Sequence, residues 1–350
     1  MKIGIDIRKI NDYGIGTHIR NVVLAAADIA TQHEFFLFYD PVDSPNTNPR
    51  FQLIAEPSAK YSLREHFSLA RNAKEQAIDL FHSPHYTLPL RWEGRSIVTV
   101  HDLIHIKFQE YFPAWKVQAA RYVLRRAVQK SEKVIVVSDT TRADLTELIP
   151  EATKKIHVIY NRLSQKWFGP APKTSLDSLG IPNDFILYTG NFKKHKGIDV
   201  LMEAYRAGKD LPFLVLIGQN HDLDHDLSQQ ILNTPNVRLL GFGRTDFLHT
   251  LYSRAMLFVF PSRYEGFGYP PLEAMACGCP VLSSDAPAMK EVLGNAADFF
   301  ASGNAEDLLC RLVEICSDET KRKTLSEMGR IQALKFTTSD SLKKLTELWA

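Results

Sequence analysis

The stretch FVFPSRYEGFGYPPLEAMACGCPVLSSD, residues 258–285, decides the fold. It begins with an apolar run of strand type and continues into a loop that contains two glycines. The paired prolines of GYPP predict the first turn of a short helix, and the glycine and proline of CGCP predict its end before a second apolar strand. This order predicts a βαβ unit, in which the unpaired N–H groups at the start of the helix form an anion site.

Two carboxylates, Glu265 and Glu273, bracket the glycines of this loop. A carboxylate repels a phosphate, so the pair is better suited to accepting hydrogen bonds from neutral hydroxyls on either side of a bound diphosphate. A nucleotide sugar carries such hydroxyls on its transferred sugar and on its ribose. The alternative is that Glu265 is a solvated loop residue and that Glu273 offsets the helix dipole. The intervening GFGYPP favours the first interpretation.

The rest of the chain alternates strand-like runs with helical stretches, a pattern typical of the α/β class with doubly wound parallel sheets. We expect a turn over residues 11–17, a helix from there to about Ala30, and a loop over residues 40–50. The loop over residues 161–182 separates two series of strands. We therefore predict Rossmann-like domains over residues 1–165 and 166–335 and a final helix in residues 336–350, with a cleft at the carboxyl ends of the strands. Strands are expected at residues 2–7, 35–39, 51–55, 79–82, 96–101, 133–138 and 156–160, and at 185–189, 212–217, 237–240, 257–260, 281–284 and 298–300.

Composition and charge exclude several classes of protein. The net charge of +2 in 350 residues is too small to indicate a nucleic-acid-binding protein. No run of 18 apolar residues is present and Met1 leads directly into a strand, so we expect neither a membrane span nor a signal peptide, and a cytoplasmic protein. The four cysteines lie late in the chain without a matching metal-ligand pair, which favours packed, reduced thiols over a metal or redox site.

Polar residues follow three strand-like runs of the N-terminal half. Gly14 and Gly16 follow the first run, His82 ends another, and His101 and Asp102 follow a third. The glycines would let backbone amides approach a phosphate or a sugar. A single histidine at a strand end is typical of a structural hydrogen bond, but three polar features at one sheet edge also suit a binding site.

Three other polar segments are open to two interpretations. The turn GNFKKHKG, residues 190–197, is either a solvated basic turn or a diphosphate-neutralising loop in which Lys196 is the best-placed cation. Residues 221–226, HDLDHD, contain a D-x-D that suits a metal, although these aspartates equally suit the first turn of a helix, and we predict no metal site. The basic, aromatic region 116–130 is either a solvated flank or a peripheral contact with an anionic membrane surface.

Taken together, these motifs resemble the retaining glycosyltransferases of family 4, which have the GT-B fold. The run EGFGYPPLE matches the E-x7-E signature of that family, and AMACGCPV continues the match. The opening strand with Gly14-Ile-Gly16, VTVHD at 98–102, VIVVS at 134–138, and Gly190 with Lys196-Gly197 follow in the family's order. The resemblance covers essentially the whole chain.

The resemblance implies a role for each candidate residue. Glu273 would bind the donor ribose and Glu265 the transferred sugar, while the backbone amides of Gly266, Phe267, Gly268 and Tyr269 would bind the diphosphate. Lys196 would neutralise the leaving diphosphate, Gly16 would close on the phosphates, and His101 would position the donor sugar. Gly14, His82 and Asp102 would lie on the acceptor side. Many members carry arginine where this chain has Asn191, so Lys193 or Lys194 would substitute for it at the phosphates. The last helix would cross back to the N-terminal domain.

The function that the resemblance implies is sugar transfer with retention of configuration, without a metal or a cofactor beyond the nucleotide diphosphate sugar. The residues from Lys2 to Arg8 and GIGTHIR are similar to bacterial mannosyl- and rhamnosyltransferases of surface polysaccharide assembly, which favours GDP-mannose as donor and a glycan or lipid-linked glycan as acceptor. The alternatives are a nucleotide sugar epimerase of the same fold and a non-catalytic nucleotide-sugar-binding subunit. No nucleic-acid partner is expected.

Overall fold

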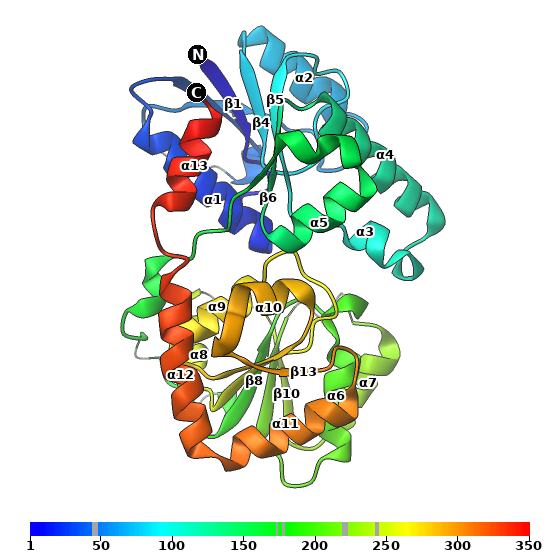
Figure 1. Cartoon of the computed structure of the whole chain (residues 1–350), viewed down its shortest axis with the longest axis vertical. Coiled ribbons are helices and arrows are strands. Elements are labelled where there is room, and N and C mark those ends of the chain that lie inside the picture. The colour runs from blue at the N-terminus through cyan, green and yellow to red at the C-terminus, as the bar shows by residue number, and fades with distance from the viewer. Residues whose placement is uncertain (44–47, 173, 177–178, 219–222, 242–244) are drawn as a thin grey trace. The chain divides into compact units, whose positions relative to one another are not determined.

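The computed structural model describes residues 1–350 apart from 44–47, 173, 177–178, 219–222 and 242–244 (Figure 1). The chain divides into two compact units. The first contains Met1–Arg162 together with Thr338–Ala350, and the second contains Leu163–Thr337.

The first unit is built on a parallel sheet that has seven strands within the described residues. The order β3-β2-β1-β4-β5-β6-β7 places β1 and β4 side by side, with Ile3 opposite Leu80 and Ile5 opposite His82. The carboxyl ends of these strands therefore meet at one edge of the sheet. The strands are β1 (Lys2–Asp6), β2 (Glu34–Tyr39), β3 (Gln52–Ala55), β4 (Leu80–Ser83), β5 (Arg95–Val100), β6 (Lys133–Val136) and β7 (Ile156–Val158).

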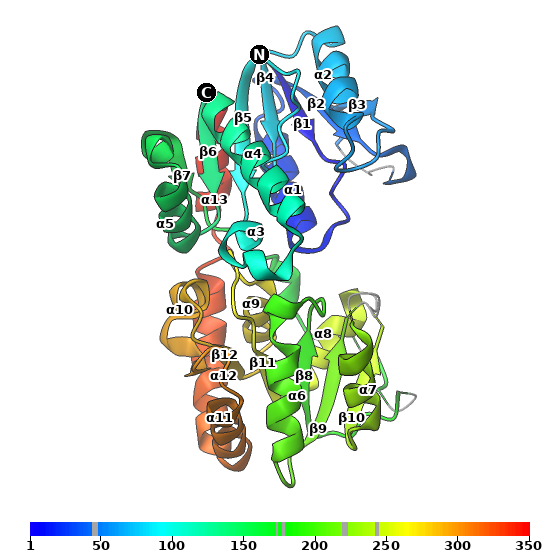
Figure 2. The same ribbon diagram turned by 90° about the vertical axis from the view of Figure 1, so that its right-hand side faces the viewer.

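Helices cover both faces of this sheet because its strands are apolar on both sides. Phe36 and Phe38 of β2 pack with α2, α4 and α5, while Phe35 and Leu37 face the opposite core with α1 and α13. Helix α13 packs against α1, and its end buries Trp349 completely. Figure 2 shows α4 and α5 against the strands. The helices are α1 (Tyr13–Asp28), α2 (Glu65–Glu75), α3 (Ile104–Lys107), α4 (Ala114–Lys130), α5 (Asp139–Leu148) and α13 (Asp340–Leu348).

The second unit repeats the architecture with a parallel sheet of six strands in the described residues, in the order β10-β9-β8-β11-β12-β13. The order reverses between β8 and β11, the position where open α/β sheets bind ligands. Its strands are β8 (Phe185–Thr189), β9 (Phe213–Ile217), β10 (Val237–Leu240), β11 (Leu257–Phe260), β12 (Val281–Ser284) and β13 (Asp298–Phe300). Its helices are α6 (Ile198–Ala207), α7 (His225–Asn233), α8 (Thr245–Arg254), α9 (Tyr269–Ala276), α10 (Pro287–Leu293), α11 (Ala305–Ser317) and α12 (Glu319–Leu334).

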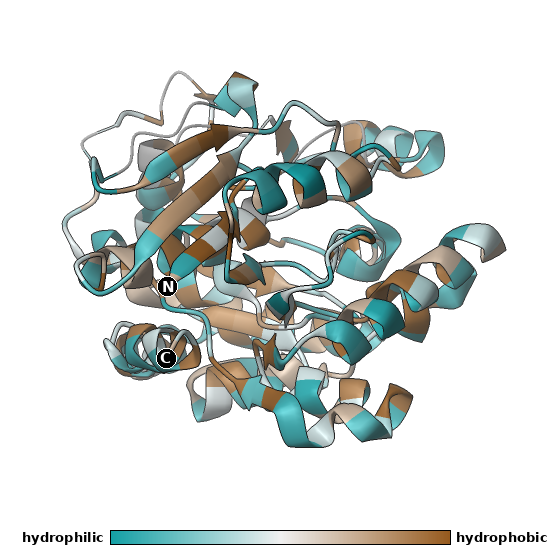
Figure 3. Cartoon of the chain, turned by 90° about the horizontal axis from the view of Figure 1, so that it is seen from above, coloured by the Kyte–Doolittle hydropathy of each residue, from teal (hydrophilic) through white to brown (hydrophobic). Residues whose placement is uncertain are grey.

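The predicted class of two doubly wound parallel sheets is confirmed. Figure 3 shows the physical basis: the strands are mostly brown, and teal residues gather on the helices around them. One prediction was wrong, because residues 11–17 are not a turn that precedes the helix. Helix α1 already begins at Tyr13, which places Gly14 and Gly16 in its first turns. Within the loop predicted over residues 40–50, Pro41–Asp43 form a short 3-10 helix and residues 44–47 lie outside the described residues.

Candidate active site

The loop after β11 leads into α9 through a left-handed glycine. Gly268 has φ +90° and is the N-cap of α9. A side chain here would be strained by that backbone angle, and its Cβ would lie 2.4 Å from Met289 Cε. Pro270 and Pro271 occupy the first turn of α9, where a proline loses no helical hydrogen bond. The backbone amides at the start of α9 are thereby held at the carboxyl end of β11.

A second glycine brings the basic turn against this loop. Gly197 has φ +71°, and a Cβ at this position would lie 2.0 Å from the carbonyl oxygen of Pro261. The backbone N–H of Arg263 donates to the carbonyl oxygen of His195 at 2.7 Å, and the Arg263 guanidinium pairs with Asp199 through two bonds of 2.8 and 2.7 Å. The turn after β8 and the loop after β11 are therefore locked together.

This contact joins the predicted cation to the predicted carboxylate. Lys196 Nζ lies 2.5 Å from Glu265 Oε1, and Ser262 Oγ lies 2.7 Å from the same oxygen. The side chains of Lys196 and Glu265 are each 14% exposed, so the pair is shielded but still open to solvent at one side. The Lys196 ammonium also lies 5.8 Å from the centre of the Phe260 ring. A partly shielded ammonium is suited to charge that develops on a leaving group.

Glu273 is held by a separate chain of hydroxyls. Tyr252 donates from its hydroxyl to Glu273 Oε2 at 3.3 Å, and Thr189 Oγ1 lies 2.7 Å from the same hydroxyl. Burial, followed by the neighbouring Glu273 carboxylate, raises the pKa of Tyr252 well above its usual value. Tyr252 therefore stays a neutral donor that orients Glu273 from inside the core.

The position where the resembling family carries arginine has a structural role here. The carbonyl oxygen of Asn191 accepts a hydrogen bond of 2.7 Å from the Tyr188 hydroxyl, and its Oδ1 accepts a weaker one of 3.4 Å from the backbone N–H of Lys193. Lys193 and Lys194 are both exposed. Asn191 thus shapes the turn, and the lysines beside it remain free to turn toward an anion.

In the first unit the structure places His101 in a cluster of histidines. His101 Nε2 donates to the carbonyl oxygen of Pro84 at 2.9 Å, and its ring lies edge-to-face on His18 at 4.9 Å. His18 is fully buried between Asn161 Oδ1 at 2.9 Å and Thr99 Oγ1 at 3.2 Å. Burial, with a contribution from His101, lowers the pKa of His18 well below its usual value, and burial also lowers the pKa of His101. Both rings are neutral at physiological pH.

The other predicted residues of the first unit differ in exposure. Gly14 is exposed, whereas the backbone N–H of Gly16 already donates to the carbonyl oxygen of Asp12. Glycine is required at position 16 because a Cβ there would lie 2.3 Å from the carbonyl oxygen of Ile10. Asp102 Oδ1 accepts a hydrogen bond of 3.0 Å from the backbone N–H of Ile104, the first residue of α3. Gly16 therefore has a packing role, and its amide is occupied.

His82, which was predicted on the acceptor side, does not lie on an open surface. Its side chain is completely buried, and its Nδ1 accepts a hydrogen bond of 3.2 Å from the Trp349 indole. His82 therefore anchors the last residues of the chain to the sheet of the first unit.

Comparison with known families agrees with this geometry. The model described as "Glycosyltransferase Family 4" matches residues 13–162, and the model described as "Glycosyl transferases group 1" matches residues 177–332. The chain belongs to the family 4 glycosyltransferases. It is a glycosyltransferase of the retaining hexosyltransferase type, with the GT-B fold.

Two relatives of this glycosyltransferase are named as O-antigen chain mannosyltransferases. It is 28% identical over 271 residues to O-antigen chain mannosyltransferase B of Escherichia coli, covering 73% of this chain and 70% of that protein. It is 30% identical over 218 residues to O-antigen chain mannosyltransferase RfbU of Salmonella typhimurium, covering 61% of this chain and 58% of the relative. The match thus spans less than two thirds of the second relative.

Solved structures share the fold at low sequence identity. A sucrose-phosphate synthase from Thermosynechococcus elongatus superposes with a TM-score of 0.81 at 20% identity, covering 100% of this chain and 98% of that one. Anabaena HepE, solved in complex with UDP and glucose, gives a TM-score of 0.77 at 19% identity, covering 100% and 99%. These likenesses concern the fold of the glycosyltransferase.

Sequence reasoning missed three polar residues beside the histidine cluster and one in the second unit. His18 was hidden by the wrong start of α1, although its spacing of four residues from Gly14 places both on one helix face. Lys9 and His85 are both buried beside Thr87, with Lys9 Nζ 3.1 Å and His85 Nδ1 3.3 Å from its hydroxyl. Tyr252 lies in α8 with no local motif around it. Only the fold brings these residues to the strand ends.

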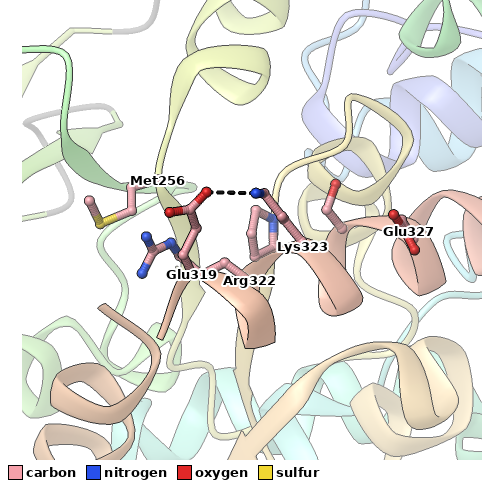
Figure 4. Close-up of a pocket in the computed structure, with 7 residues that line it drawn as sticks. Met256, Glu319, Arg322, Lys323 and Glu327 are labelled. Carbon is pink, nitrogen blue, oxygen red and sulfur yellow. Dashed lines mark ion pairs between the residues drawn. The ribbon is translucent and has the colours of Figure 1, made fainter. Parts of the chain in front are cut away.

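A pocket of 270 Å³ in the second unit lies apart from this chemistry (Figure 4). Its wall is mostly α12, where Glu319 and Lys323 pair at 2.7 Å. Met256 and Pro280 also line it, and they precede the amino ends of β11 and β12. Glu265 follows the carboxyl end of β11, so the pocket and the candidate site lie at opposite ends of the sheet.

The remaining predicted features concern metal ligands, cysteines and contact with a membrane. No cluster of histidine, cysteine and carboxylate side chains there could hold a metal ion. Of the segment 221–226, His221 and Asp222 lie outside the described residues, and Asp224 caps α7 by accepting from the Leu227 N–H at 2.8 Å. All four cysteines are free thiols. Among the described helices, none is long and apolar enough to cross a bilayer.

Proposed function

We propose that this chain transfers mannose from GDP-mannose to a hydroxyl of a glycan or lipid-linked glycan, with retention of configuration and without a metal ion. The observation that carries the proposal is the pair Lys196–Glu265, held beside the start of α9 by Gly197 and Gly268. It combines a cation, a carboxylate and oriented amides at the reversal of strand order in the second unit.

Each group has a distinct task in the proposed mechanism. The amides of residues 266–269 and the Lys196 ammonium bind the diphosphate, and Lys196 stabilises the charge that grows as the bond to the sugar breaks. Among the described residues, Lys196 and Ser262 both bond to Oε1 of Glu265. Its second oxygen, Oε2, can therefore accept a hydrogen bond from a hydroxyl of the transferred sugar. Glu273, oriented by Tyr252, accepts from the ribose hydroxyls. Lys193 or Lys194 adds positive charge at the phosphates.

The choice of mannose rests on the relatives. Two of them are named as O-antigen mannosyltransferases, which also supports a surface glycan as the acceptor. The bound nucleotide of HepE is UDP, so a donor panel must include UDP-sugars as well as GDP-mannose. His101 stays a predicted contact of the donor sugar, and Gly14 and Asp102 stay predicted on the acceptor side.

Peripheral attachment to a membrane is a further part of the proposal for a lipid-linked acceptor. Helix α4 exposes Trp115 and Tyr122, and the exposed Lys116, Arg125 and Lys130 lie on the same helix. Aromatic side chains with cations on one helix suit an anionic lipid surface.

The test is a transfer assay with purified protein, a panel of nucleotide sugars and EDTA, in which the anomer of the product is determined. We expect GDP-mannose to be selected and the anomeric configuration to be retained. An inverted product, or activity that disappears with EDTA, contradicts the mechanism. Conversion of GDP-mannose to another nucleotide sugar without acceptor would indicate an epimerase, and binding without any turnover a non-catalytic subunit.

Substitution of the cation sharpens this test. Lys196→Ala should lower kcat by about 10²- to 10³-fold, the effect of removing one group that stabilises developing charge. Lys209→Ala is the matched control, because that lysine is exposed in the same unit and follows the far end of α6. Equal activity of the two variants would remove Lys196 from the mechanism.

A further inference from the structure

Tyr61 is an exposed aromatic residue with an unfavourable backbone. It has φ +63°, in the left-handed region that bulky residues rarely adopt, and its side chain is 60% exposed. Exposure means that its ring contributes little to the core, so packing does not explain why tyrosine rather than glycine or asparagine occupies this position. Strained residues held by their surroundings are typical of ligand-binding positions.

A buried ionic network holds this conformation. The backbone N–H of Tyr61 donates to Glu65 Oε2 at 3.0 Å, and the same oxygen pairs with Arg8 Nη1 at 3.2 Å. Arg8 in turn pairs with Asp6 at 2.8 Å, and all three charged side chains are buried. Burial alone would raise the pKa of Asp6, but the Arg8 guanidinium more than offsets this and lowers it. Removing charges from water costs free energy, so a buried ionic network adds little to the stability of the fold. Its main effect here is to fix the backbone position of Tyr61.

Beside the ring lies a buried lysine without an ion-pair partner among the described residues. Lys9 Nζ is 4.0 Å from the centre of the Tyr61 ring and donates to Thr87 Oγ1 at 3.1 Å. Lys9 is 4% exposed, and burial lowers its pKa to about 8. The His85 ring completes the surroundings, 5.9 Å from Tyr61 and edge-to-face with it.

From this arrangement we infer that Tyr61, Lys9 and His85 form a subsite for a sugar of the acceptor glycan. Lys9 covers one face of the Tyr61 ring, and the exposed remainder of the ring offers an apolar surface for the C–H face of a sugar. Lys9 and His85 are both buried and support the ring from the protein side. The inference rests on the proposed glycosyl transfer and adds to it the acceptor residues of the first unit.

The test uses α-linked mannobiose as the probe, with binding measured by saturation-transfer NMR on the full chain. Tyr61→Gly removes the ring and relieves the backbone, since glycine accepts φ +63° without strain. We expect its affinity for mannobiose to fall about tenfold, the loss of one aromatic stacking contact. Tyr61→Phe should keep the affinity of the original chain, because the ring is retained. Lys9→Met, of similar length but uncharged, should weaken binding as well.

The matched control is Phe67→Ala on α2, whose ring is 51% exposed in the same unit. Equal mannobiose affinity for Tyr61→Gly and Phe67→Ala, or no saturation transfer from the original chain, overturns the inference. Donor binding is measured in parallel by thermal shift with GDP-mannose and should be the same in all these variants. Loss of the shift in the unsubstituted chain would instead contradict the proposed donor, so the two failures are distinguishable.

Discussion

The two units build the carboxyl edge of their sheets by different means. In the first unit this region carries buried titratable groups, among them neutral His18 and His82 and the ion pair of Asp6 and Arg8. In the second unit left-handed glycines fix the backbone and leave the charged pair of Lys196 and Glu265 partly exposed. Burial makes a rigid edge that is sensitive to pH, whereas backbone positioning leaves charged side chains able to act on a ligand.

The largest expected effect comes from removing the side chain that closes the first unit. Trp349 is completely buried, donates to His82 and packs edge-to-face on Phe35 at 5.4 Å. Trp349→Ala should lower the free energy of unfolding of the first unit by about 3–5 kcal/mol, as for other large cavities. Hydrogen exchange monitored by mass spectrometry should show faster exchange in residues 1–162 and unchanged exchange in 163–337.

The control for that substitution is Trp115→Ala, since Trp115 is 68% exposed on α4. It should leave exchange unchanged throughout the chain. If Trp349→Ala accelerated hydrogen exchange equally in both units, the two units would not be stabilised by separate cores.

The second largest expected effect is a loss of stability at acidic pH that is greater in the first unit than in the second. Burial lowers the pKa of His82 to about 3, from an ordinary value of 6.5, and its Nε2 meets no hydrogen-bond partner among the described residues. The folded state therefore binds fewer protons than the unfolded state, so stability is complete above pH 6.5 and is lost as the pH falls from 6.5 toward 3. At pH 5.5 this loss is about 1.4 kcal/mol for His82 alone. His18 and His85, whose pKa values burial also lowers, add to it.

The measurement is hydrogen exchange at pH 7 and 5.5, corrected for the intrinsic rate. Residues 1–162 should lose protection at the lower pH, and residues 163–337 should lose less. His82→Gln, which cannot take up a proton, should reduce the pH dependence. A profile that is unchanged by this substitution would show that another group responds to acid.

Sequence alone predicts the second unit's site better than the first unit's. The loop after β11 is a local pattern, in which glycines, prolines and two carboxylates lie within nine residues, so Glu265 and Glu273 can be recognised without a fold. The sequence also shows a glycine at position 197, but it does not show why glycine is required there. A side chain at this position would collide with the carbonyl oxygen of Pro261, which lies 64 residues later in the chain. Strand positions are predictable because buried parallel strands are continuous apolar runs.

The first unit's edge depends on contacts between distant segments. The sequence predicts that His82 lies at the end of a strand, but it does not predict the hydrogen bond that His82 makes. Its partner is Trp349, which lies 267 residues away in the chain. The helix start at Tyr13 was missed because glycines favour a turn when judged locally. Tyr61 has no motif at all, and its left-handed backbone becomes visible only with Glu65 and Arg8 in place. Sequence patterns report local geometry, and these residues are placed by burial.

The smallest expected effect tests whether the second unit also depends on a buried hydroxyl. Tyr252→Phe removes the group that links Thr189 to Glu273 but keeps the ring in the core. Glu273 would then lose one orienting hydrogen bond, worth about 1 kcal/mol, so the Kd for GDP-mannose in a thermal-shift or calorimetric titration should rise about fivefold. Tyr205→Phe is the matched control, because that hydroxyl is buried in the same unit and meets no partner among the described residues. A rise in Kd for Tyr252→Phe alone would mean that the second unit, too, uses a buried group, and that this group orients the carboxylate proposed to bind the ribose. Equal Kd values would mean that Glu273 is placed without help from the Tyr252 hydroxyl.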